Sequence, residues 1–447
     1  MWTYQGPHAA VKGRVRQTGA ARRTACAAFI GLLAMSAYAD EPALTLGQAE
    51  RIAVERSQQL AAEDLGIAAS RERASAAGTL PDPMLKFGVD NLPVEGVTRL
   101  STQRDFMTMR RIGLSQDWVR PSTRHLRDAR GADAVKVNEA ERAVTLATVQ
   151  RETAIAWLDA HYAAAIVAEL QAQKAQAERE VVAANGVYRE GRGALADVFA
   201  IRGVTAEIDE RMIDVTRRLQ VARSALLRWV GEPANSALAG RPAIDEIPWH
   251  NHDLAAQLDD HPEIRLASQR AELARTELKL AEAAKKPDWS IELSYAARGE
   301  GFSNMVSVGF AVPLQINRRD RQNREVAARR AELAQAEAVR ADMWRAHTAE
   351  AEALLAQWEA DRARRDRYQS DILPLAAHRS EAALTAYRGG RGMLTDVLAA
   401  RRTEIEMRLK ALEVEASAAR AWATLTYLVP APSVSPSPQP AAPENLP

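Results

Sequence analysis

Cysteine and surplus charge are both scarce in this sequence. Its 447 residues contain a single cysteine, Cys26, so a disulfide within one chain and a zinc site built from cysteines are excluded. The 59 Lys and Arg residues nearly balance the 58 Asp and Glu residues, and the net charge of +1 excludes a nucleic-acid binder that depends on bulk charge. No stretch offers about 18 uninterrupted apolar residues, so we predict no membrane-spanning helix.

The motifs of common catalytic sites are also missing. The sequence has no H-E-x-x-H zinc motif, no G-x-S-x-G nucleophile elbow and no Walker A loop with its lysine. The glycine-rich stretch 389–392 follows a predicted helix instead of a strand, which argues against a phosphate-binding loop. The scattered carboxylates fit solvated helix faces. We therefore predict that the protein is not an enzyme and uses no cofactor.

The first 39 residues have the three parts of a secretory signal peptide. Residues 1–23 carry five basic residues and no acidic one, an apolar run follows over 25–35, and small residues flank a cleavage site at 37–39. The apolar run is too short to span a membrane. We predict a signal peptide over 1–39, cleaved near Ala39, which would leave a mature chain without cysteine.

The remainder of the chain repeats itself. Residues 188–198 (YREGRGALADV) recur as 387–397 (YRGGRGMLTDV), with eight of eleven positions identical at an offset of 199. A period this long indicates a duplicated domain and not a solenoid. We divide the chain into a first repeat, a Gly- and Pro-containing connector, a second repeat and a disordered tail, which cover residues 40–230, 231–262, 263–429 and 430–447.

Each repeat has the same predicted plan of a helix, two strands, a very long helix, a tight glycine turn and another helix. Apolar and polar residues alternate with a period of two over about 84–91 and 109–118, and again over about 289–297 and 304–315. Helical patterns cover about 44–76, 121–189 and 318–388, with turns at 189–194 and 388–393. The helices over about 121–189 and 318–388 would each be about 100 Å long. Pro374 should kink the last of them.

Four strands per chain are too few for a membrane barrel of their own, because the smallest such barrels need about eight. Strands with one apolar face and one small or polar face suit a barrel with lipid outside and water inside, and three chains would supply twelve strands. A small soluble β-subdomain capping a coiled coil is the alternative that the pattern leaves open. We predict a mainly α fold with a small β part, built of long coiled-coil helical hairpins in a twofold internal repeat.

These features together resemble the TolC-type outer-membrane efflux family over about residues 42–430. The family's turn motif, Y-x-x-G-x-x-x-x-x-D-V, is present twice, after a ~68-residue helix in each repeat. Three further stretches, 81–83 (PDP), 91–93 (NLP) and 106–116 (FMTMRRIGLSQ), look like the heavy-metal branch of the cobalt–zinc–cadmium and copper–silver type.

The resemblance implies a homotrimer in the cell outer membrane that extends into the periplasm. Its twelve strands would form a shared transmembrane β-barrel on an α-helical periplasmic tunnel, girdled by the connector. The implied partners are outer-membrane lipid, a periplasmic adaptor (membrane fusion) protein and an inner-membrane pump of the resistance–nodulation–division class, and no nucleic acid. The chain would be the passive exit duct for heavy-metal cations. Drug efflux or type I protein secretion through the same duct is one alternative, and a periplasmic coiled-coil scaffold or adaptor is another.

The two turns hold the residues to which the resemblance assigns a role. The turns would meet the adaptor through Gly191, Arg192, Gly193, Gly389, Gly390, Arg391 and Gly392. Asp197 and Asp396 would lie at the periplasmic mouth, where copies of Asp396 around a threefold axis form an acidic ring that favours cations. The plainer interpretation is that the glycines only make the turns and that the acids only favour the start of a helix.

Two pairs of residues are weak candidates for metal ligands. Met107 and Met109 offer soft sulfur atoms near a strand edge. His250 and His252 are spaced by two in the connector. A wide duct gains nothing from tight binding of its cargo, so strand-edge and surface positions are the simpler interpretations, and we assign no metal site. The following 261–263 (HPE) stretch predicts a helix start with Pro at the first position.

Overall fold

The computed structural model describes residues 43–191, 193–240, 242–247 and 258–428. The predicted signal peptide and C-terminal tail lie outside this range. Within it, helices make up most of the chain and the strands are few, so the predicted fold class is confirmed.

The first repeat begins with two helices where the sequence predicted one over 44–76. These are α1 (Leu46–Arg56) and α2 (Gln58–Ala77). Ser57 lies between them with φ −66° and ψ 108°, and its Oγ accepts a hydrogen bond from the backbone N–H of Leu60 at 3.2 Å. Serine is a favoured N-cap residue, so Ser57 ends one helix and starts the next. The helical periodicity on both sides hid this break.

Strands and long helices follow in the first repeat. They are β1 (Met84–Asp90), β2 (Met109–Trp118), α3 (Pro121–Arg189) and α4 (Leu195–Val230), and the connector then begins with the short 3₁₀ helix η1 (Glu232–Asn235). Pro121 is the first residue of α3, a position where its missing N–H leaves no hydrogen bond unmade. The 69 residues of α3 make a rod of about 100 Å.

The second repeat follows the same plan, with a single helix before its strands and a long helix interrupted by η3, and two of its elements differ from the expected bounds. Its elements are α6 (Pro262–Ala283), β3 (Trp289–Ala297), β4 (Met305–Ala311), α7 (Gln322–Arg367), η3 (Tyr368–Ile372), α8 (Leu373–Arg388) and α9 (Leu394–Leu428). The strand predicted over 304–315 ends at Ala311, because Pro313 has no N–H to donate to a ladder. The helix predicted from 318 begins only at Gln322, after a turn.

The interruption expected at Pro374 takes the form of a wide turn. The five residues of η3 are π-helical, and the N–H of Leu373 donates to the carbonyl of Tyr368, five residues earlier. Pro374 follows within the first turn of α8. Since proline can neither donate a hydrogen bond nor avoid the carbonyl four residues before it, the backbone widens just ahead of it.

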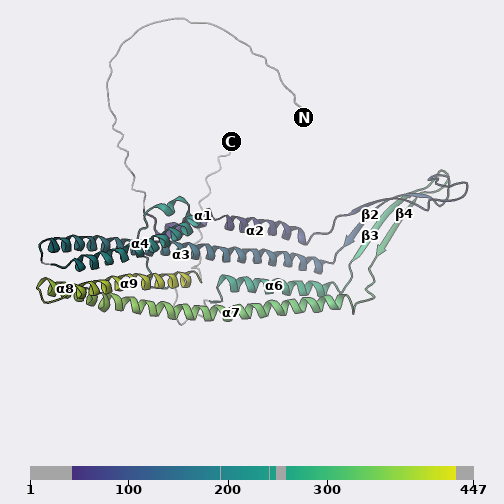
Figure 1. Cartoon of the computed structure of the whole chain (residues 1–447). Coiled ribbons are helices and arrows are strands. Elements are labelled where there is room, and N and C mark those ends of the chain that lie inside the picture. The colour runs from purple at the N-terminus through teal and green to yellow at the C-terminus, as the bar shows by residue number, and fades with distance from the viewer. Residues whose placement is uncertain (1–42, 192, 241, 248–257, 429–447) are drawn as a thin grey trace, which may run out of the picture. The chain divides into compact units, whose positions relative to one another are not determined.

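The four strands form one antiparallel sheet in the order β1-β2-β3-β4 (Figure 1). The pairing of β2 with β3 joins the two repeats, with Trp118 opposite Trp289 and Ile112 opposite Tyr295. Because β2 leads into α3, and α3 then runs to the first turn, the sheet and that turn lie at opposite ends of one helix.

Helix packing surrounds the centre of α3. This helix contacts α2, α4, α6 and α9, and α7 contacts α6 and α9. The main core includes Trp157, Leu226 and Ala418, all nearly or fully buried. The indole N–H of Trp157 donates to the carbonyl of Leu44 at 3.0 Å, and that of Trp358 donates to the carbonyl of Ile244 at 3.0 Å. These two hydrogen bonds attach the segments around Leu44 and Ile244 to α3 and α7. In the described ranges, no helix has the length and apolarity required to cross a bilayer.

Candidate functional site

The two hairpin turns share a glycine in the left-handed conformation. Gly191 (φ 71°) and Gly390 (φ 70°) occupy the same position of the repeat, and their N–H groups donate to the carbonyls of Tyr188 at 2.9 Å and Tyr387 at 3.0 Å. A left-handed residue just after a helix is a common way to end it, and glycine adopts this conformation without steric cost. A Cβ on either glycine would touch nothing within 4 Å, so the backbone angle alone selects glycine here.

The second glycine of each turn is required for a different reason. A Cβ on Gly193 would lie 3.0 Å from Cγ1 of Val187, and one on Gly392 would lie 3.2 Å from Cβ of Ala386. A larger residue at either position would therefore need its neighbours to shift by a few tenths of an ångström. Gly389 has an ordinary backbone conformation (φ −80°). The Arg391 side chain is exposed at the turn, whereas Arg192 lies outside the described residues.

The two acids after the turns are placed differently. Asp197 is half-buried, and its Oδ2 accepts a hydrogen bond from the backbone N–H of Ala194 at 3.4 Å, which closes the start of α4. Asp396 is exposed on the first turn of α9. The structure thus gives Asp197 a capping contact and leaves Asp396 open to solvent.

Exposed apolar side chains accompany the turns, a feature that the sequence reasoning missed. Leu195 and Phe199 on the first turns of α4 are 47% and 59% exposed, and Met393 beside the second turn is 65% exposed. The guanidinium of Arg202 lies 6.0 Å from the centre of the Phe199 ring. Large apolar groups gathered at one end of a hairpin suit contact with another protein. The position of Phe199 off the buried stripe of α4 was the available signal.

The sheet has a continuous apolar face that no part of the described chain covers. The register sets Phe87, Ile112, Tyr295 and Val306 in one row across the four strands, and Leu85, Leu114, Leu293 and Val308 in the next. All eight side chains are exposed, with Phe87 at 74% and Val306 at 68%. The opposite face holds small and polar residues, of which Ser115 and Ser294 are buried. An uncovered apolar face of this extent must meet lipid or protein.

Aromatic residues mark the end of the sheet that adjoins the helices. The rings of Trp118 and Trp289 stack with their centres 5.5 Å apart, and Phe310 lies 6.3 Å from Trp289. Tryptophan favours the boundary between lipid and water, where its ring is in the apolar layer and its N–H remains near water.

The weak metal candidates are not assembled into a site. Met107 is 49% exposed in the loop before β2, and Met109 starts β2 opposite Asp90. His250 and His252 lie outside the described residues. In the described part of the chain, no three His, Cys, Asp or Glu side chains come together as a metal ion would require.

A histidine pair lies where the sequence predicted the start of a helix. His261 is the N-cap of α6, and its Nδ1 accepts a hydrogen bond from the backbone N–H of Glu263 at 3.2 Å. Its ring centre is 4.1 Å from that of His347, whose Nε2 lies 2.9 Å from a carboxylate oxygen of Glu263. Burial, with a smaller contribution from His347, lowers the pKa of His261 to about 4.

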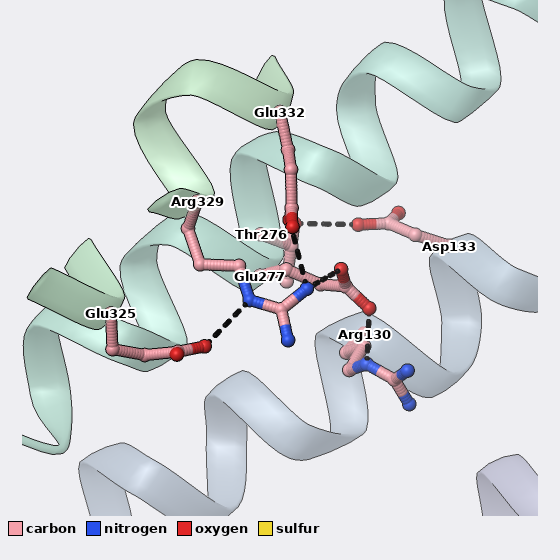
Figure 2. Close-up of polar contacts among 7 residues, drawn as sticks. All are labelled: Arg130, Asp133, Thr276, Glu277, Glu325, Arg329 and Glu332. Carbon is pink, nitrogen blue, oxygen red and sulfur yellow. Dashed lines mark hydrogen bonds and ion pairs between the residues drawn. The ribbon is translucent and has the colours of Figure 1, made fainter. Parts of the chain in front are cut away.

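Close to the sheet, an ion-pair network joins helices of both repeats (Figure 2). Glu277 on α6 receives hydrogen bonds from Arg130 on α3 at 2.8 Å and from Arg329 on α7 at 3.0 Å. The buried hydroxyl of Thr276 donates to Asp133 of α3 at 2.7 Å. These contacts hold α6 between α3 and α7 and so fix the helices that lead into the sheet.

The comparisons with known proteins agree with this architecture. No protein-family model matches the chain. It is 26% identical over 300 residues to the cobalt-zinc-cadmium resistance protein CzcC of Cupriavidus metallidurans. This match covers 63% of this chain and 70% of CzcC. The outer membrane protein VceC of Vibrio cholerae superposes with a TM-score of 0.71 at 18% identity, covering 86% of this chain and 95% of VceC. The channel-forming protein CusC gives 0.69 at 15% identity, covering 86% and 91%.

The sequence match and the structural matches support different parts of the earlier resemblance. The structural neighbours have the same mainly helical fold with few strands, and the sequence relative is a heavy-metal resistance protein. The resemblance of this chain to the TolC-type outer-membrane efflux family, and to its heavy-metal resistance branch, is therefore confirmed.

Proposed function

We propose that three copies of this chain form a passive exit duct in the outer membrane, through which an efflux system expels heavy-metal cations. In this proposal the chain works with a periplasmic adaptor protein and with an inner-membrane pump of the resistance–nodulation–division class. The pump supplies the energy and selects the cargo, and this chain supplies the path.

The observation that carries the proposal is the uncovered apolar face of a four-stranded sheet. Four strands cannot close a barrel, so the outer edges of β1 and β4 need partners from other copies. Three copies supply twelve strands, with the rows of Phe87 and Leu85 toward lipid and the small, polar face toward water. The stacked Trp118 and Trp289 then lie at the membrane boundary on the helix side.

The hairpin turns are the surface that we propose for the adaptor. They lie at the far ends of α3 and α8 from the sheet, and they combine exposed apolar groups such as Phe199 and Met393 with the exposed Arg391. An adaptor tip that offers apolar and acidic groups would complement them.

The proposal that the cargo is metal cations rests on the likeness to CzcC and on one feature of the chain. Asp396 is exposed after the second turn, and three copies in a ring would raise the local concentration of cations at the periplasmic mouth. The ring would be a single one, because the chain has Ala399 instead of a second acid one helical turn after Asp396.

The test combines assembly, conductance and resistance. The detergent-extracted protein should have the mass of three chains and should form cation-selective pores in a planar bilayer. A deletion strain should become sensitive to cobalt, zinc or cadmium, and the plasmid-borne gene should restore resistance. A protein that high salt washes from membranes and that does not conduct would contradict the duct. Pores without a metal phenotype would contradict the cargo alone.

A further inference from the structure

Four charged side chains meet on the small, polar face of the sheet. Lys86 and Asp90 come from β1, Arg111 from β2 and Glu292 from β3. The Nζ of Lys86 lies 2.7 Å from Oε2 of Glu292, and Arg111 lies 3.1 Å from Asp90 and 3.7 Å from Glu292. The two cations and two anions cancel, and Glu292 is the one acid that contacts both cations.

A glycine makes the central contact possible. The register sets Lys86 opposite Gly113 of β2, and Gly113 opposite Ser294 of β3, so Lys86 reaches Glu292 diagonally across β2 above Gly113. A Cβ on Gly113 would lie 3.1 Å from Cβ of Ser294 and 3.6 Å from Oε1 of Glu292. The absence of a side chain at this position leaves room for the ion pair to cross the strand.

The cluster lies on the face opposite the exposed apolar rows. Side chains alternate along a strand, so Lys86 points away from the face that carries Leu85 and Phe87. In the barrel of the proposed function, on which this inference rests, lipid contacts the apolar face and the four charges face the water-filled lumen. Their side chains are 28% to 43% exposed, which leaves them accessible to passing ions.

We propose that Glu292 is a selectivity-determining residue of the duct. Lys86 and Arg111 alone would place a ring of positive charge on the barrel wall and repel cationic cargo. The Glu292 carboxylate cancels one of these charges, and Asp90 cancels the other. The four-residue cluster therefore adds no net charge to the wall, and cations admitted at the periplasmic mouth meet no excess positive charge where the cluster lies.

The test measures ion selectivity of purified channels in planar bilayers under a salt gradient. Glu292→Gln leaves one uncompensated positive charge per chain, and we expect the cation-over-anion permeability ratio to fall about threefold. Lys86→Gln leaves one uncompensated negative charge, so the ratio should rise. The double variant Lys86→Gln with Glu292→Gln restores neutrality and should return the ratio to that of the unaltered channel.

Each outcome decides the inference. Unchanged ratios in both single variants would overturn it, while their conducting pores would leave the duct itself intact. If the Glu292→Gln protein fails to assemble, Lys86→Gln decides by itself, because Glu292 still pairs with Arg111 in that variant. An unaltered protein that forms no pores would instead contradict the proposed function.

Discussion

At the scale of single residues, His261 shows how burial controls the charge of a side chain. The residue is 6% exposed, caps α6 through its neutral Nδ1, and packs against the His347 ring, which is tilted by 31°. Burial disfavours the imidazolium, and the neighbouring His347 and Arg151 disfavour it further, while Glu263 partly opposes them. The pKa of His261 is therefore lowered to about 4.

This lowered pKa predicts an acid-sensitive fold. Between pH 6.5 and about pH 4, His261 is protonated in the unfolded chain but not in the folded chain. The free energy of unfolding should therefore fall as the pH decreases through this window. The loss should be on the order of 2 kcal/mol. Thermal unfolding of the detergent-solubilised protein between pH 7 and pH 4 measures it.

The matched variant is His261→Asn. Asparagine is a good N-cap residue and does not titrate, so the helix start remains. The part of the pH dependence of the free energy of unfolding that comes from His261 should then disappear. Equal slopes for the two proteins over this pH range would show that His261 is not the responsible group.

At the scale of elements, each hairpin turn depends on a glycine in the left-handed conformation. Gly191 and Gly390 have φ near +70° in corresponding turns, although different helices enter them. The same geometry at both positions indicates that the turn belongs to the repeat unit and is set by local sequence. It also means that the two turns can be tested as a pair.

We expect Gly390→Val to damage the turn and the proposed adaptor contact together. A β-branched residue at positive φ costs about 1–3 kcal/mol, and it should reduce co-purification with the adaptor of the same efflux system and metal resistance of a complemented deletion strain. Gly191→Val should act in the same direction. Gly203→Ala in the interior of α4 is the control, because a Cβ there meets nothing within 4 Å. Normal docking and resistance in both valine variants would show that the adaptor does not use these turns.

At the scale of the whole molecule, the proposed selectivity of the mouth exists only in the assembly. One exposed Asp396 on one chain is an ordinary helix-start acid, but in the proposed trimer three copies would share a narrow opening. The corresponding Asp197 already caps α4 through Ala194 and is half-buried. The two acids should therefore differ in their effect on conduction.

We expect Asp396→Asn to lower the cation-over-anion permeability ratio by about twofold, since it removes three negative charges from the mouth of the trimer. Asp197→Asn keeps an oxygen that can accept the N–H of Ala194, and it should change the ratio less. The measurement is the reversal potential of reconstituted channels in a salt gradient. An unaltered ratio for Asp396→Asn would refute the acidic ring.

The sequence by itself determined those features that depend on neighbouring residues. The alternation over 84–90 and 305–311, the helical pattern of α3 and the duplicated turns are all local signals, because side-chain direction and backbone angle follow from short stretches. The same locality explains the errors: a serine cap at Ser57 and a proline at 313 end elements that the hydrophobic pattern alone continues.

The tertiary structure decided whatever depends on pairing between distant segments. The β2–β3 ladder joins the two repeats, and its register together with that of β1–β2 brings Lys86 to Glu292 across Gly113. The contact between the His261 and His347 rings likewise depends on the packing of α6 against α7. A single sequence contains no periodic signal for such contacts, because the contacting residues are far apart in the chain. The strength of these contacts comes from burial and charge, which only the folded structure brings together.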